Sequence, residues 1–105
     1  ASALSLMLEG LRKPVVLTGS QIPLVELRND GLDNFLGDLG LAALYPIPEV
    51  TLYFHHKILR GNRASKHEAS SLDAFDSPNL PPLATVGIDV EVNRAAAGRY
   101  GLNVA

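Results

Sequence analysis

The stretch PVVLTG, residues 14–19, decides the fold expected of this chain. It is a short apolar run, rich in β-branched residues and closed by Gly19, which is typical of a strand buried on both faces of a parallel sheet. A second run of this kind, Val50–Phe54, follows after a helical pattern. The order strand, helix, strand predicts a βαβ unit with two parallel strands and a right-handed crossover. We therefore expect an α/β fold.

The helix between these strands is predicted from its spacing and its ends. Asp30 is a residue type that caps helix N-termini, and the prolines of YPIP, residues 45–48, end the helical pattern. Gly37 and Gly40 lower the helix propensity, so we infer that the helix packs closely against a neighbour there. The apolar face of this helix consists of Leu32, Phe35, Leu36, Leu39 and Ala43.

Flanking segments extend this unit on both sides. The apolar spacing within residues 4–11 predicts a helix that ends near residues 10–13. Residues 71–84 form a proline-marked loop in this interpretation, and Val86–Val92 alternates as an edge or half-exposed strand does. Two buried strands need flanking strands and helices on both faces to complete a sheet. We therefore expect an incomplete parallel-sheet segment of a larger α/β domain over residues 1–92, with a weakly patterned tail over residues 93–105.

The composition narrows the class of protein. The net charge of −2 argues against a general nucleic-acid binder, because such binding rests on many phosphate contacts. The chain has no cysteine, which excludes disulfides, thiolate metal sites and cysteine nucleophiles and is compatible with a reducing compartment. No apolar run approaches the roughly 18 residues of a membrane span, so a soluble protein is expected.

Ligands of open parallel sheets bind on the loops that leave the carboxyl ends of the strands. Here these loops begin at residues 19–21 and at His55. The second loop contains HHKILRGNRASKH, residues 55–67, which holds all three histidines and four of the nine Lys and Arg residues. This segment is a solvated loop, a phosphate or nucleic-acid patch, or a catalytic lysine framed by its supports.

Residues in these loops also have ordinary structural explanations. Lys66 in a glycine-containing loop is most often a solvated charge. The adjacent histidines at 55–56 would point to opposite faces of a strand and have no carboxylate at ligand spacing, which disfavours a metal site. Arg60, Arg63 and Lys66 lack the glycine pattern of a phosphate loop. Ser20 lacks a nucleophile-elbow motif and is better interpreted as a turn serine.

Three segments, taken together, carry a resemblance to a known family. They are KPVVLTGSQIPLVELRNDG at residues 13–31, RGNRASK at residues 60–66, and DAFDSPNLPPLATVGIDV at residues 73–90. In this order they resemble consecutive blocks of the L-asparaginase family, most closely the type I, cytoplasmic form and the asparaginase domain of animal asparaginase/lysophospholipase proteins. The resemblance implies the N-terminal domain of an enzyme that hydrolyses L-asparagine to L-aspartate and ammonia without a metal or other cofactor.

The resemblance also implies a role for Lys66. In the family, the lysine that closes the RGNR-x-[ST]-K segment joins a threonine and an aspartate in a Thr-Lys-Asp triad. A threonine hydroxyl is a weak nucleophile until a neighbouring group accepts its proton, and a lysine in a partly desolvated site can do so. Gly19 and Ser20 match the segment whose backbone approaches the side-chain amide of the substrate, with Ser20 contributing its carbonyl.

The same resemblance implies supporting roles for further residues and shows which family motifs are missing. Residues 60–63 are expected to shape the loop that presents Lys66, with Gly61 permitting the turn. Asp30 and Asn34 lie in a block that supports the site and the subunit interface in the family, although helix capping is an equal alternative for them. The family's two nucleophile motifs, TGGT and GTDT, are absent from these 105 residues. We therefore expect the chain alone to be inactive.

The implied partners are the small-molecule substrate L-asparagine and further copies of the parent protein, because asparaginases are dimers or tetramers. A cytoplasmic location is implied, without a membrane or nucleic-acid partner. Two alternatives stay open. One is the asparaginase-like component of archaeal tRNA amidotransferases, which the TGSQIPL block and the near-neutral charge disfavour. The other is a non-catalytic interaction module, which the missing nucleophile permits.

Overall fold

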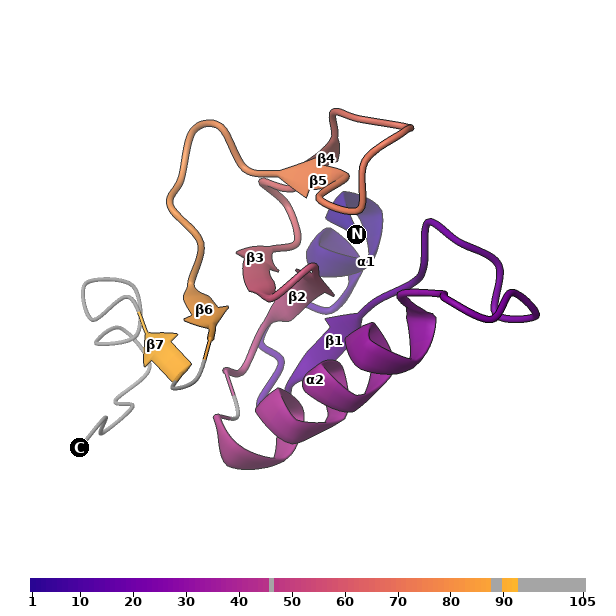
Figure 1. The fold of residues 1–105 in the computed structure, drawn as a ribbon. Coiled ribbons are helices and arrows are strands. Elements are labelled where there is room, and N and C mark those ends of the chain that lie inside the picture. The colour runs from indigo at the N-terminus through magenta and orange to yellow at the C-terminus, as the bar shows by residue number, and fades with distance from the viewer. Residues whose placement is uncertain (46, 88–89, 93–105) are drawn as a thin grey trace.

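The computed structural model describes residues 1–45, 47–87 and 90–92. Figure 1 shows a mixed sheet with one long helix beside it. The elements, in chain order, are α1 (Ser2–Met7), β1 (Val15–Leu17), α2 (Gly31–Leu44), β2 (Val50–Phe54), β3 (Lys57–Arg60), β4 (Ser65–Lys66), β5 (Phe75–Asp76), β6 (Ala84–Val86) and β7 (Val90–Val92). Within the described residues, no helix has the length and apolar character needed to cross a membrane.

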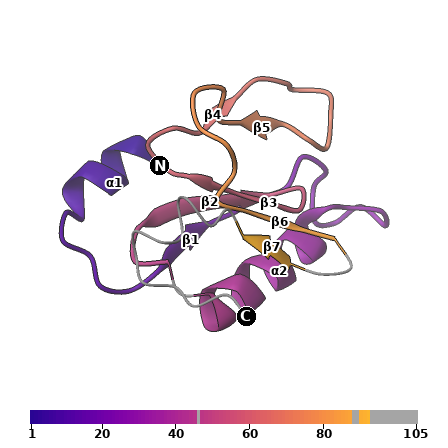
Figure 2. The ribbon, with the colours of Figure 1, turned by 90° about the vertical axis from the view of Figure 1, so that its left-hand side faces the viewer.

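The predicted βαβ unit is confirmed. Strands β1 and β2 pair in parallel, with Val15 opposite Val50 and Leu17 opposite Leu52, and α2 connects them. Helix α2 lies along one face of the sheet, whereas the small β4–β5 pair lies on the opposite side (Figure 2). This arrangement confirms the α/β class and puts the loops after β1 and β2 near β4.

The sheet is nevertheless mixed rather than purely parallel. Its strand order is β1-β2-β3-β6-β7, and the β2–β3, β3–β6 and β6–β7 pairs are antiparallel. All residues of β2 are buried, as predicted, but β1 is only half buried. The physical reason is position, because β1 lies at the edge of this sheet and β2 lies inside it.

A tight turn replaces the long loop expected from His55 onward. His55 and His56 have φ values of 47° and 66°, and they join β2 directly to β3 as a hairpin. A two-residue hairpin turn needs positive φ at such positions, and Asn-Gly or Asp-Gly is its usual sequence. The histidine pair gives no such signal, so the sequence does not predict the hairpin. The two histidines also lie in a turn rather than on opposite faces of a strand.

The predicted apolar face of α2 is wrong. Its large side chains Leu32, Phe35, Leu36 and Leu39 are 52–62% exposed. The buried residues of the helix are instead Gly31, Asn34 and Leu41, which recur at intervals of three and seven and so share one helix face. Leu41 packs in the core with Ile47, Tyr53, Ile58, Leu83 and Ala84.

Small residues bring α2 close to the sheet. A Cβ atom added at Gly37 would overlap the phenol ring of Tyr53, so the inferred close packing is confirmed at this glycine. It is wrong at Gly40, where an added Cβ would meet no atom of the described residues within 4 Å. The helix therefore approaches β2 along the face of Gly37 rather than along its leucine-rich face.

Two further boundary predictions are corrected. Helix α1 ends at Met7, before the predicted end near residues 10–13, and it buries none of its residues. The predicted strand Val86–Val92 is divided into β6 and β7, which pair with each other and place Val86 opposite Val90. The expected tail over residues 93–105 lies outside the described residues, so its division from residues 1–92 stays a prediction.

Candidate functional site

A pocket of about 140 Å³ gathers the residues that the sequence nominated. It lies where the loop after β1 meets β4 and β5. Lys66, Gly19 and Ser20 all contribute to its wall. The full lining is Thr18, Gly19, Ser20, Gln21, Leu52, Phe54, Lys66 and Phe75. The structure thus brings together side chains and backbone from the first and second predicted site loops.

Lys66 enters this pocket from a short strand rather than from a loop. Strand β4 pairs with β5 so that Lys66 lies opposite Phe75, and its Nζ is 6.0 Å from the centre of the Phe75 ring. Lys66 Nζ also donates a hydrogen bond of 2.9 Å to Gln21 Oε1. The side chain is exposed. The partly desolvated site expected for this lysine stays a prediction for the complete protein.

Gln21 is a site residue that the sequence analysis does not identify. Its Nε2 donates hydrogen bonds of 3.0 Å to the Ala69 carbonyl and 3.2 Å to the Ser71 carbonyl. One side chain therefore joins the loop after β1 to the segment that follows Lys66. The only sequence signal is the position of Gln21 directly after Gly19-Ser20, because its partners lie 45–50 residues further along the chain.

Asp30 holds the backbone of the same loop. Its carboxylate accepts hydrogen bonds from the backbone N–H of Gln21, at 3.0 and 3.1 Å. It also accepts one from the backbone N–H of Ile22, at 3.0 Å. Asp30 occupies the N-cap position of α2, but its side chain makes no capping bond there. Asn29 Oδ1 accepts from the first helical N–H groups instead, at 3.0 Å from Gly31 N. The capping role predicted for Asp30 is therefore wrong.

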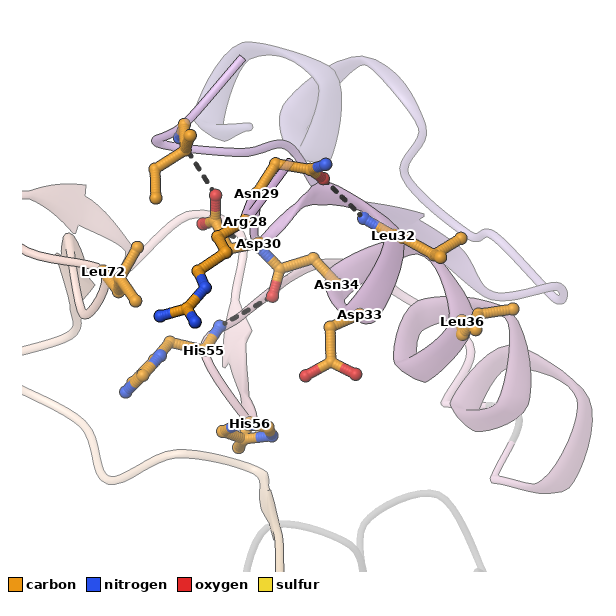
Figure 3. A pocket seen from close by; sticks show the side chains of 11 residues that line it. Arg28, Asn29, Asp30, Leu32, Asp33, Asn34, Leu36, His55, His56 and Leu72 are labelled. Atoms are coloured by element: carbon orange, nitrogen blue, oxygen red, sulfur yellow. Dashed lines mark hydrogen bonds between the residues drawn. The ribbon is translucent and has the colours of Figure 1, made fainter. Parts of the chain in front are cut away.

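Asn34 connects the ends of the two parallel strands. Its Nδ2 donates 2.9 Å to the Gly19 carbonyl. Its Oδ1 accepts 3.2 Å from the His55 N–H (Figure 3). The side chain is buried, with 4% of its surface exposed. Since buried amides are costly to leave unpaired, Asn34 fixes where the chain leaves β1 and β2.

Beside this network lies a larger pocket of about 450 Å³, drawn in Figure 3. Its wall includes Arg28, Asp33, His55 and His56. The two imidazole rings are 5.2 Å apart and tilted. In residues 1–45, 47–87 and 90–92, no three side chains of His, Cys, Asp or Glu gather as a metal site would require.

The basic residues at 60–66 do not converge on one ligand. Arg60 Nε donates to Glu49 Oε1 at 2.7 Å, and both side chains are mostly buried. Lys66 points instead to Gln21. Gly61 N donates 2.9 Å to the Val50 carbonyl, and an added Cβ at Gly61 would lie 2.6 Å from the same oxygen. Gly61 is thus needed for close approach to β2 rather than for a special turn.

Acid is expected to loosen the loop that Asp30 holds. Burial raises the pKa of Asp30, but hydrogen bonds from Ile22 and Gln21 outweigh it and leave the pKa below its usual value of 3.8. A carboxyl group with a lowered folded pKa contributes stability above its unfolded pKa, and this stability is lost as the pH falls through the folded pKa. The affected window therefore lies below about pH 4.

Urea unfolding of the Asp30→Asn variant tests this expectation. At neutral pH its free energy of unfolding should be about 1–3 kcal/mol below that of the wild type, because two N–H groups lose a charged acceptor. On acidification it should lose less stability than the wild type. Asp33→Asn, which removes an exposed carboxylate from the same helix, serves as the charge control. Parallel pH curves for Asp30→Asn and the wild type would contradict the assignment.

The sequence and the fold match one family of α/β proteins. The family described as "Asparaginase, N-terminal" matches residues 1–98, and the chain belongs to the asparaginase family. More particularly, it is 61% identical over 90 residues to L-asparaginase 1 of Escherichia coli K12, a match that covers 86% of this chain and 27% of that protein. It is 58% identical over 94 residues to the mouse 60 kDa lysophospholipase, covering 90% of this chain and 17% of that protein.

Solved structures agree with the sequence comparison. The crystal structure of L-asparaginase I from Vibrio cholerae superimposes with a TM-score of 0.83 at 56% identity, covering 90% of this chain and 28% of that one.

Similarity to a glutamyl-tRNA(Gln) amidotransferase component of Saccharolobus solfataricus is lower, at 37% identity over 93 residues, covering 82% of this chain and 21% of that protein. The chain spans between 16% and 28% of the length of the asparaginases and lysophospholipases compared.

Proposed function

We propose that this chain is the part of an L-asparaginase that supplies the lysine of its catalytic triad. The reaction is the hydrolysis of L-asparagine to L-aspartate and ammonia, without a metal or organic cofactor. The observation that carries the proposal is the shared pocket of Lys66, Gly19 and Ser20. These residues come from distant parts of the sequence, and the family resemblance assigns them to its catalytic and substrate-binding segments.

Lys66 acts as the base in the first step. A threonine hydroxyl attacks the side-chain amide carbon of asparagine while Lys66 accepts the hydroxyl proton. The C–N bond then breaks, and the nitrogen takes up a proton and leaves as ammonia. Water next cleaves the aspartyl ester, which releases aspartate and restores the threonine hydroxyl. A neutral amine at Lys66 is required for the first proton transfer.

The attacking threonine is not Thr18, although Thr18 lines the pocket. Its hydroxyl donates 2.8 Å to the Tyr53 carbonyl and is therefore engaged with the neighbouring strand. The family's TGGT and GTDT motifs do not occur in these 105 residues. We assign the nucleophile and the triad aspartate to sequence outside this chain, and the chain alone does not turn over asparagine.

The substrate amide is bound by backbone at the end of β1. Asn34 Nδ2 already donates to the Gly19 carbonyl. By the family resemblance, the Ser20 carbonyl is the group assigned to accept from the substrate amide, while the lack of a side chain at Gly19 lets the ligand approach the backbone. The Ser20 hydroxyl has no role in bond cleavage in this assignment.

Ammonia release from L-asparagine tests the proposal. The complete protein that carries this chain should release ammonia from L-asparagine, and the isolated chain should not. Failure of the complete, folded protein to hydrolyse L-asparagine would favour the alternative of a non-catalytic interaction module. Turnover by the isolated chain would show that it contains its own nucleophile.

Assembly and location belong to the same proposal. We propose a homodimer or homotetramer in the cytoplasm, and its support is the resemblance to the type I form. Sedimentation of the complete protein and fractionation of the cells that produce it would test the two statements separately. A monomeric active enzyme would contradict the first of them.

A second candidate function is that of a component of a tRNA-dependent amidotransferase. The similarity to the Saccharolobus amidotransferase component favours it, whereas the net charge of −2 opposes extensive phosphate contact. Tight tRNA binding by the complete protein, with a steep dependence on salt, would support this candidate over the free-asparagine hydrolase.

A further inference from the structure

Gln21 is the side chain that contacts Lys66, and it is itself held from two sides. Its Nε2 donates to the carbonyls of Ala69 and Ser71. The amide nitrogen is therefore directed at the segment after β4. Because the amide is planar, this leaves Oε1 on the side of Lys66, where it accepts the 2.9 Å hydrogen bond.

The backbone of Gln21 is fixed as well. The carboxylate of Asp30 accepts the Gln21 N–H, and Asn34 holds the Gly19 carbonyl two residues earlier. The chain leaving β1 is thus tied to α2 on one side and to the segment carrying Lys66 on the other. Few of the rotamers of a free glutamine are compatible with all of these bonds.

We propose that Gln21 is the positioning residue for Lys66, and that its amide oxygen sets the place of the ammonium group relative to the Ser20 carbonyl. This inference rests on the function proposed above and adds to it a residue outside the triad. Gln21 touches Lys66 and does not take part in bond cleavage. An amide suits this task because it orients an amine by a hydrogen bond and, unlike a carboxylate, does not favour its protonated form by charge.

The charges around Lys66 allow the effect of an amide at position 21 to be distinguished from that of a carboxylate. Among the residues that line the pocket, Lys66 is the charged side chain. The titratable groups along β4, β5 and their extensions include His67, Glu68 and Asp76. On the other elements, Asp30 accepts the Gln21 N–H, and Lys57, paired with Asp73 at 2.7 Å, donates to the Phe75 carbonyl at 3.4 Å. Glu68 is engaged by Ser70, and Asp76 Oδ1 accepts from Ser77 N at 2.8 Å. A carboxylate introduced at position 21 would therefore be the strongest new influence on the Lys66 amine.

Two variants of the complete protein test the proposal. Gln21→Met, of similar length, should lower kcat for L-asparagine by about tenfold or more with little change in KM, because Lys66 is no longer oriented. Gln21→Glu should move the rising limb of the kcat–pH profile to higher pH, because the carboxylate favours the protonated amine. A merely structural role would lower thermal stability in both variants and leave the shape of the pH profile unchanged.

A labelling measurement separates this inference from the proposed function. Reductive methylation of Lys66, followed by mass spectrometry, should be faster in Gln21→Met than in the wild type, since the amine has lost its acceptor. This readout needs no turnover. Suppose that Lys66→Met abolishes turnover, but that both Gln21 variants show unchanged labelling and wild-type kcat–pH profiles. This result would overturn the positioning role of Gln21. Faster labelling in a protein without asparaginase activity would keep the Gln21–Lys66 contact but overturn its role in this reaction.

Discussion

Replacing Lys66 with methionine in the complete protein is expected to lower kcat for L-asparagine by about 10²–10⁴-fold, the usual contribution of a general base. Methionine retains most of the length of the side chain but cannot accept a proton. The residue lies on the pocket wall between Phe75 and Gln21, and it is exposed. Its removal should therefore leave the fold intact, so that the loss is one of chemistry.

The matched control for this substitution is Lys13→Met. Lys13 is also exposed, and it lies before β1 rather than in the pocket. We expect wild-type kcat and KM in this variant. Initial rates of ammonia release and the thermal unfolding midpoint should be measured for both proteins. Near-normal turnover in a folded Lys66→Met protein would remove Lys66 from the catalytic machinery.

Leu41→Ala is expected to destabilise the isolated chain by about 2–5 kcal/mol, the range for leucine truncation in a packed core. Leu41 is 4% exposed and contacts the cluster formed with Tyr53 and Ile58. The smaller side chain leaves a cavity between α2 and the sheet. Since a domain of this size has only about 5–15 kcal/mol of stability, this one change is expected to remove a large part of it.

The neighbouring substitution Leu39→Ala should change stability by no more than about 0.5 kcal/mol, because surface substitutions have small effects. Leu39 is 57% exposed and lies on the same helix. The two variants make the same chemical change two positions apart, so helix propensity cancels in the comparison. The urea concentrations at the unfolding midpoints of the two variants measure this difference in stability. A larger loss at Leu39 than at Leu41 would show that the leucine-rich face covers the sheet after all.

The parallel pair could be predicted from sequence because both strands are short apolar runs with clear ends. PVVLTG and Val50–Phe54 carry that signal themselves. The packing face of α2 could not be predicted in the same way. Periodicity identifies an apolar face but not the surface that it meets, and here small residues such as Gly37 allow the closer contact with Tyr53.

The candidate site could likewise be predicted only in part. Gly19, Ser20 and Lys66 are nominated by strand ends and by family resemblance, and the structure gathers them at one pocket. Gln21 could not be predicted because its hydrogen bonds join residues 45–50 positions apart, and no local pattern records such a contact. The capping prediction for Asp30 fails because local capping rules cannot foresee a competing pair of N–H groups in another loop.

The most direct test of the account is an enzyme hybrid. Residues 1–90 of this chain would replace the matching segment of L-asparaginase 1 from Escherichia coli, to which the chain is 61% identical over 90 residues. The hybrid is expected to release ammonia from L-asparagine, and Lys66→Met within it is expected to abolish this release. A folded hybrid without turnover, or one whose turnover survives Lys66→Met, would contradict the claim that this chain supplies the catalytic lysine of an asparaginase.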